Sequence, residues 1–302
     1  MFMVICLTFS RIAEPTVVFN NGQVNLVDYT INDIVDIQNS PSGTPTTVNL
    51  VGGGNILGYR CHINDKSVMN ISNGSVQGYV LALDNTRFNM TSGNIKDSLL
   101  GDGYSHLNVS GGFIASSGEG NLQVSNHSEV IFRGGQVGDY SNLSANDFRV
   151  GDFAKGTIMG GTIERLLALD EGQVNIKGGQ IGYSSYLISM LLYEDSKTTM
   201  SGGKIFGPVY LGANPFWIEN CMLTVEGDNF KINGLPVDYG NYFNTNPTYT
   251  DYYLTGTLRS GEQINNTIRL YDNTVLYLVP EPATLLLLGL GVPILAGLRR
   301  KR

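Results

Sequence analysis

The chain has 302 residues, and it combines many glycines with few charged side chains. Gly accounts for 38 residues, and charged residues make up 15% of the chain, against about 25% in a typical globular protein. This composition disfavours a helix-rich fold and favours strands joined by tight turns. The formal net charge is −7 in spite of a basic C-terminus, and no basic patch is present, so nucleic-acid binding is not expected.

The N-terminal segment, residues 1–13, resembles the end of a secretory signal peptide. Residues 1–8 are predominantly apolar, but no basic residue precedes them, and Arg11 follows the apolar run. A complete signal peptide is longer and has its basic residues in front of the apolar stretch. We therefore expect the natural start of the protein to lie upstream. Residues 14–47 are predicted to form an N-terminal cap.

Cysteine and histidine give no sign of a disulfide framework or of a metal site. The three cysteines are an odd number at distant positions, so we interpret Cys61 and Cys221 as small buried side chains. No CxxC or Cys/His ligand spacing occurs, and His62, His106 and His127 form no ligand pattern. We expect neither a metal nor another cofactor.

A repeated octet runs through residues 48–221. Its pattern is apolar, often Asn, apolar, any residue, a small or polar residue, Gly, any residue, and Ile or Val. A loose copy lies at 48–56, and clean copies follow at 69–76, 88–95, 107–114, 130–137, 156–163, 174–181 and 198–205. The second glycine of the octet recurs about every 21 residues, which indicates a repeat architecture.

Each octet predicts a short strand, a sharp turn and the start of a second strand. Apolar residues on either side of a polar one alternate as in a half-buried strand, and Gly takes positive φ freely. A unit of this length holds three short strands but cannot bury its own apolar face. Units stacked at about 4.8 Å share one core, which predicts an all-β, right-handed, single-stranded parallel β-helix. The LxxLxL pattern of leucine-rich repeats is missing, and a β-propeller needs a longer unit.

Stacking of the octets also places like residues above one another. Asn70, Asn89 and Asn108 are expected to form an asparagine ladder on one face, and Asn175 to continue it farther along the chain. Such ladders stabilise in-register parallel stacks.

The candidate catalytic residues lie two positions beyond the last apolar residue of each octet. Asp97, Asp139 and Arg165 occupy these positions, and a single column would place the two aspartates roughly 9.6 Å apart. Carboxylates about 6.5–9.5 Å apart are typical of inverting glycosidases. However, Asp is common in turns, and an exposed Asp139–Arg165 ion pair is the plainer interpretation. We therefore predict no catalysis, with a polysaccharide hydrolase or lyase as the alternative.

Two interpretations are also open for four tyrosines, Tyr183, Tyr186, Tyr193 and Tyr210. They are candidates for an aromatic surface that stacks on sugars. We favour the interpretation that they line strand faces or pack at the cap.

The octet rhythm changes after Gly203, and residues 222–279 are predicted to form a C-terminal cap. Residues 254–258 and 273–278 have strand patterns, whereas the Tyr- and Asn-rich segment 238–253 is expected to be a loop. A cap is needed because the open end of a β-helix exposes unpaired strand edges.

The last segment, residues 280–302, has three parts in a fixed order. Pro280, Glu281 and Pro282 come first, an apolar run follows at 285–298, and the chain ends in Arg299, Arg300, Lys301 and Arg302. The apolar run has 14 residues, short of the ~20 of a full transmembrane helix, so we expect a short hydrophobic helix. The basic end is expected to stay in the cytoplasm and the rest of the chain outside.

These three parts resemble the PEP-CTERM sorting signal of bacterial surface proteins. The resemblance implies recognition by a membrane protease of the exosortase type, transient membrane anchoring through 285–298, and removal of the tail during sorting. The octets and the cap sequence are similar to those of repeat-rich PEP-CTERM surface proteins, whose molecular function is largely unassigned. We therefore expect an exported protein of the cell envelope, surface or extracellular matrix, structural or adhesive rather than enzymatic. Extracellular polysaccharides and matrix proteins are its expected partners.

Overall fold

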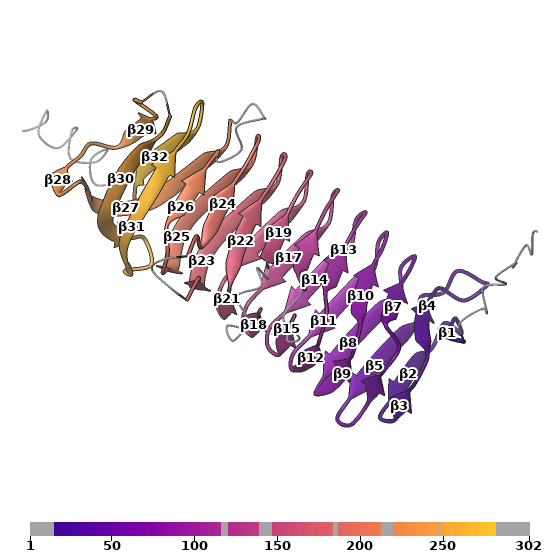
Figure 1. Ribbon diagram of the computed structural model, residues 1–302. Coiled ribbons are helices and arrows are strands. Elements are labelled where there is room, and N and C mark those ends of the chain that lie inside the picture. The colour runs from indigo at the N-terminus through magenta and orange to yellow at the C-terminus, as the bar shows by residue number, and fades with distance from the viewer. Residues whose placement is uncertain are drawn as a thin grey trace, which may run out of the picture.

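The computed structural model describes residues 15–115, 120–138, 147–183, 187–212, 220–246 and 248–281. These residues form one elongated, all-β solenoid that runs from the indigo N-terminal end to the yellow C-terminal end in Figure 1. The predicted parallel β-helix is therefore confirmed. Among the described residues, no helix has the length and hydropathy that crossing a bilayer requires. The expected signal-peptide remnant at 1–13 and the expected helix at 285–298 lie outside the described residues.

The solenoid has three faces, and within each face a strand pairs in parallel with the strand of the next turn. Face A consists of β1 (Thr16–Phe19), β4 (Ile34–Ile37), β7 (Arg60–Ile63), β10 (Tyr79–Ala82), β13 (Leu99–Gly101), β16 (Leu122–Val124), β19 (Asp147–Val150), β22 (Arg165–Ala168), β24 (Met190–Leu192), β26 (Val209–Leu211) and β31 (Gln263–Leu270).

Face B carries the first half of every octet. It consists of β2 (Val24–Val27), β5 (Thr47–Val51), β8 (Val68–Ser72), β11 (Arg87–Met90), β14 (His106–Val109), β17 (Glu129–Phe132), β20 (Lys155–Ile158), the first part of β23 (Gln173–Ile181) and of β25 (Lys197–Ile205), β27 (Met222–Ile232) and β32 (Val275–Pro280).

Face C carries the second half of the octets. It consists of β3 (Thr30–Ile31), β6 (Asn55–Ile56), β9 (Gly74–Val76), β12 (Gly93–Ile95), β15 (Phe113–Ile114), β18 (Gln136–Val137), β21 (Thr162–Ile163) and the ends of β23 and β25.

The apolar octet positions stack in register and fill one continuous core. On face B, for example, Phe88 pairs with Leu107 and Met90 with Val109, and all four side chains are buried. The second octet glycine is required at the corner between faces B and C. Gly112 has φ 92°, and a Cβ added there would lie 2.7 Å from the carbonyl oxygen of Gly93 in the preceding turn. A side chain at this corner would push the stacked turns apart.

The two ends of the solenoid differ. Residues 14–47, assigned above to an N-terminal cap, contain β1 to β4, and β1 already pairs in parallel with β4. At the other end β30 (Thr250–Leu258) pairs antiparallel with β27 and β31, β28 (Leu235–Pro236) with β27, and β29 (Gly240–Phe243) with β32. The antiparallel strands cover the end of the last turns.

The prediction of a loop at 238–253 is wrong in part, because β29 and the start of β30 lie within it. The Tyr- and Asn-rich sequence of this segment gives no sign that β32 has a free edge. β29 pairs with that edge and therefore forms a strand.

Candidate functional site

Two of the candidate catalytic residues, Asp97 and Arg165, do not share a column. The pairing of β13, β16, β19 and β22 aligns Leu99 with Leu166 through the intervening turns, so Arg165 shares its column with Ser98, not with Asp97. The reason is turn length: Leu99 comes four residues after Ile95, whereas its counterpart Leu166 comes three residues after Ile163. Asp97 lies in a turn, where its Oδ1 accepts a hydrogen bond of 2.9 Å from the Ser98 hydroxyl. Asp139 lies outside the described residues.

Arg165 instead belongs to an ion-pair cluster on face A, built around the buried carboxylate of Asp147. Its Nε donates to Oδ1 of Asp147 at 2.6 Å, and Arg149 donates through Nε and Nη2 to Oδ2 at 2.8 and 2.6 Å. The Asp147 side chain is fully buried, and its backbone N–H donates to Asn121 Oδ1 at 3.0 Å. The guanidinium groups of Arg149 and Arg165 thus bind one oxygen each of the Asp147 carboxylate. This arrangement indicates a structural role, which is to hold the start of β19 in place.

The asparagine ladder is the most regular polar feature of the solenoid. Asn70 Nδ2 donates to Asn49 Oδ1 at 2.7 Å, Asn89 to Asn70 at 2.8 Å, and Asn108 to Asn89 at 3.2 Å. The predicted ladder is confirmed for its first three members, and Asn49, in the loose octet at 48–56, extends it by one turn. Asn175 lies in the same column, but Ile131 and Thr157 separate it from Asn108.

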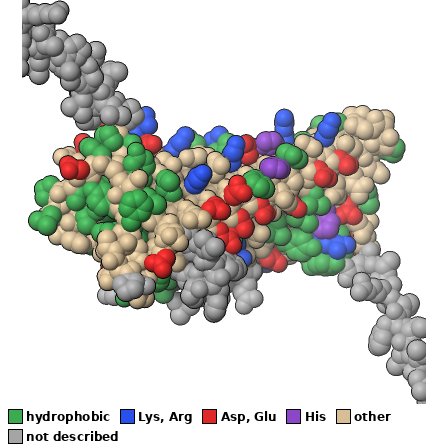
Figure 2. Space-filling model, turned by 90° about the horizontal axis from the view of Figure 1, so that it is seen from above, with side chains coloured by type: hydrophobic (Ala, Val, Ile, Leu, Met, Phe, Trp, Pro, Cys, Tyr) green, Lys and Arg blue, Asp and Glu red, His purple; other side chains and the backbone are tan. Residues whose placement is uncertain are grey.

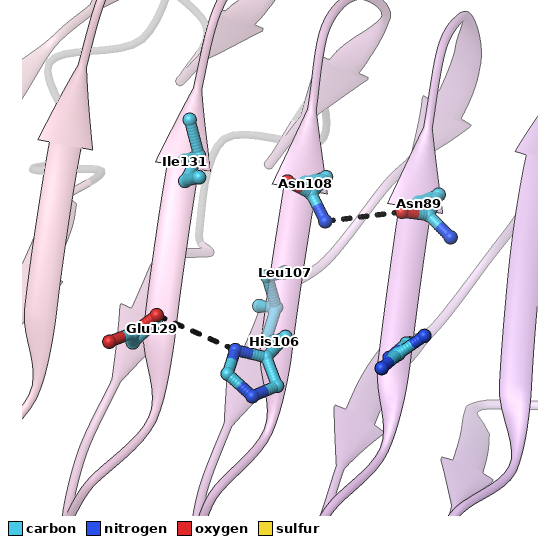
Figure 3. A pocket seen from close by; sticks show the side chains of 7 residues that line it. Asn89, His106, Leu107, Asn108, Glu129 and Ile131 are labelled. Atoms are coloured by element: carbon cyan, nitrogen blue, oxygen red, sulfur yellow. Dashed lines mark hydrogen bonds and ion pairs between the residues drawn. The ribbon is translucent and has the colours of Figure 1, made fainter.

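A row of charged side chains runs beside the ladder on face B. The register places Arg87, His106, Glu129 and Lys155 directly above one another. His106 Nδ1 lies 3.6 Å from Glu129 Oε2, and both side chains are half-exposed. Between this row and the ladder is a shallow depression of about 380 Å³, lined by Arg87, Asn89, His106, Leu107, Asn108, Glu129 and Ile131 (Figure 3).

The chemistry of this depression suits recognition of a polar polymer. Its lining includes an imidazole, a carboxylate, a guanidinium and two amides, so it offers both hydrogen-bond donors and acceptors. The half-exposed His106 and Glu129 remain hydrated, so the site does not hold a reacting group away from water. Within the described ranges no group of three or more His, Cys, Asp or Glu side chains has the arrangement of a metal site.

Of the four tyrosines, Tyr210 has its ring engaged at the cap. The Arg269 guanidinium lies 4.9 Å from the Tyr210 ring centre and 4.0 Å from that of Tyr249. Asp251 fixes the same guanidinium with two hydrogen bonds of 2.7 and 2.9 Å. Tyr186 lies outside the described residues.

The two cysteines of the described region are fully buried, as expected. Burial raises the pKa of the Cys61 thiol, and the nearby Asp36 carboxylate adds to this shift. Because only the thiolate is a strong nucleophile, Cys61 is a packing residue.

The sorting motif begins on the last strand of the folded body. Pro280 ends β32, where it pairs with Gly227, and Glu281 follows directly. Pro282, the apolar run and the basic residues Arg299, Arg300, Lys301 and Arg302 lie outside the described residues.

Comparison with known proteins identifies this C-terminal segment. The family model of the PEP-CTERM protein-sorting motif matches residues 278–302, which include all of the predicted signal and two further residues of β32. No curated protein matches the chain, and no solved structure does. The chain therefore carries a PEP-CTERM sorting signal on a parallel β-solenoid, which makes it an exported cell-surface protein that is anchored in the membrane before processing and recognised by an exosortase.

Proposed function

We propose that the protein is a non-catalytic, adhesive or structural rod of the cell surface or extracellular matrix, and that face B is its binding surface. The observation that supports this proposal is the pair of parallel polar rows on face B. Asn49, Asn70, Asn89 and Asn108 form one row, and the charged row from Arg87 to Lys155 runs beside it.

Both rows repeat once per turn, at about 4.8 Å along the rod. A long polymer that lies along the rod therefore meets the ladder amides at a constant spacing, with a side chain of the charged row beside each step from Arg87 onward. Amides donate and accept hydrogen bonds, which suits the hydroxyl groups of polysaccharides. Many weak contacts of this kind add up to firm retention, because each contact after the first is intramolecular.

Retention of the full chain on immobilised bacterial and algal polysaccharides tests this proposal. Arg87→Gln removes a cation that lines the depression on face B, whereas Lys204→Gln removes an exposed cation from face C and serves as the matched control. We expect Arg87→Gln to weaken retention by about tenfold, the effect of one charged hydrogen bond, and Lys204→Gln to leave it unchanged. Equal retention of both variants would refute a binding role for face B.

The same incubations distinguish an adhesive protein from an enzyme. New reducing or unsaturated ends are assayed in parallel with retention. Their release by the wild type, and its loss in Asp97→Asn, Asp139→Asn or Glu129→Gln, would overturn the proposal in favour of a polysaccharide hydrolase or lyase. Retention without release supports the adhesive rod.

A further inference from the structure

Face B changes character at its C-terminal end, where apolar side chains replace the polar rows. The column that contains Arg87, His106 and Glu129 ends in Met222 and Val275. The asparagine column ends in Tyr277, and on the antiparallel partner strand β29, Phe243 lies directly opposite Val275.

Side-chain alternation places this whole group on the outer side of the sheet. The side chains of Met222, Phe243, Val275, Tyr277 and Val279 form what we call the cap patch. Phe243 is 52% and Tyr277 is 38% exposed, and the other three are half-buried. Figure 2 shows hydrophobic side chains gathered at the C-terminal end of the rod, whereas acidic side chains gather over its middle.

The chain leaves the folded body next to this patch. Val279 belongs to it, and Pro280 and Glu281 follow without any linker. Strand β32 is paired on both edges, with β27 and β29, and its inward side chains Leu276 and Leu278 are fully buried. The end of β32 is therefore a fixed point, since its release would open the core.

The sequence sets how far this fixed point can lie from the membrane. The apolar run begins at Leu285, so residues 281–284 are the only spacer between β32 and the membrane segment. The five Cα–Cα steps from Pro280 to Leu285 span at most about 18 Å when fully extended. While the tail is inserted, the end of the cap patch at Val279 is therefore held close to the lipid headgroups.

We infer that the cap patch is a membrane-docking surface, which seats the C-terminal end of the rod in the interface of a phospholipid bilayer while the chain is anchored. Tyrosine suits this position, because its ring is apolar and its hydroxyl stays hydrated at the level of the headgroups. Lys197, the register neighbour of Met222 on the adjacent strand, lies exposed at the rim, where a cation meets lipid phosphate.

Tryptophan fluorescence of the full chain in phosphatidylcholine vesicles tests this inference. The chain has a single tryptophan, Trp217, which is replaced by Phe in every variant. Tyr277→Trp then reports on the cap patch. Tyr104→Trp is the matched control, because Tyr104 is 56% exposed and lies in the turn between β13 and β14, near the middle of the rod.

In vesicles with bromine near the headgroup end of the acyl chains, we expect blue-shifted emission from Tyr277→Trp and quenching about twofold or more above that of the control. Equal quenching of the two reporters would overturn the inference. So would a blue shift without quenching by the brominated lipid, because the patch would then be covered by protein, for example by a second copy of the chain. Unchanged far-ultraviolet circular dichroism confirms that each variant is folded. Vesicles hold no polysaccharide, so the result is independent of the proposed adhesive role.

Discussion

Two properties of the octet corner require glycine, namely its positive φ and the lack of space for a Cβ. Replacing Gly112 by alanine, together with a control, separates their contributions. Gly112 has φ 92°, and its added Cβ would lie 2.7 Å from the Gly93 carbonyl oxygen and closer still to Met90 Cε. Carbon contacts are optimal near 3.5–4.0 Å. The methionine methyl group can rotate away, but the carbonyl belongs to the backbone of the preceding turn. Relief of the clash must therefore separate two stacked turns.

Gly234 is the matched control for this substitution. Its φ is 82°, but no heavy atom lies within 4 Å of an added Cβ. Gly234→Ala should therefore lower the free energy of unfolding only by the conformational cost of positive φ, about 1–2 kcal/mol. Gly112→Ala should cost about 1–3 kcal/mol more, which is typical of overpacking.

Urea unfolding of the full chain in mild detergent, followed by circular dichroism, measures both variants. Equal losses of stability at the two positions would refute the argument, because they would show that the stacked turns adjust to the methyl group without cost. Hydrogen exchange adds a local readout: we expect Gly112→Ala to accelerate exchange in the turns that contain β12 and β15 before it affects the C-terminal cap.

Three further predictions concern polar groups. Asn89→Ala removes the donor to Asn70 Oδ1 and the acceptor for Asn108 Nδ2, so it should lower the free energy of unfolding by about 1–3 kcal/mol. Asn175→Ala, outside the bonded ladder, should cost less, and urea unfolding compares the two variants. Asp147→Asn removes the buried charge that two partly exposed arginines share, and it should lower the free energy of unfolding by about 3 kcal/mol. A smaller loss than for the control Asn175→Ala would contradict this role. The pKa of Asp102 is lowered, chiefly by the hydrogen bond from Asn126, so its contribution to stability is present above the unfolded pKa and is lost as the pH falls through the folded pKa. Asn126→Ala should reduce the loss of stability below about pH 4, measured by acid titration; an unchanged acid limb would contradict the assignment.

Much of the fold is encoded locally and was therefore predictable. The octet sets the strand, the corner glycine and the stacked asparagine, and all three depend only on residues within one unit. Parallel stacking then follows, because equivalent residues of successive units meet in register. The ladder from Asn70 to Asn108 could be predicted for this reason.

That Asp97 and Arg165 lie in different columns could not be predicted, because it depends on the turns between faces C and A, whose lengths differ from one unit to the next. A single difference in length moved Arg165 into the column of Ser98 and brought it to Asp147. Asp147 itself gave no signal in the sequence, since it lies outside every octet and its role depends on the start of β19. The antiparallel strand β29 was missed because it pairs with a strand more than 30 residues later.

The two proposed surfaces are compatible because the solenoid separates them along its length. From Asn108 to Tyr277 the face-B column passes through Ile131, Thr157, Asn175, Thr199 and Thr224. These six steps of about 4.8 Å place the end of the ladder about 29 Å from Tyr277 along the rod. Lys155, the last member of the charged row, lies three such steps, about 14 Å, from Met222 of the cap patch. The Debye length is about 8 Å at physiological ionic strength, so headgroup charges at the cap are screened from the charged row of face B. A rod that is seated in the membrane by its C-terminal end thus keeps the polar rows free for an extracellular polymer. Within one column of face B, the ladder asparagines belong to the proposed polymer-binding surface, and Tyr277 belongs to the proposed membrane-docking surface.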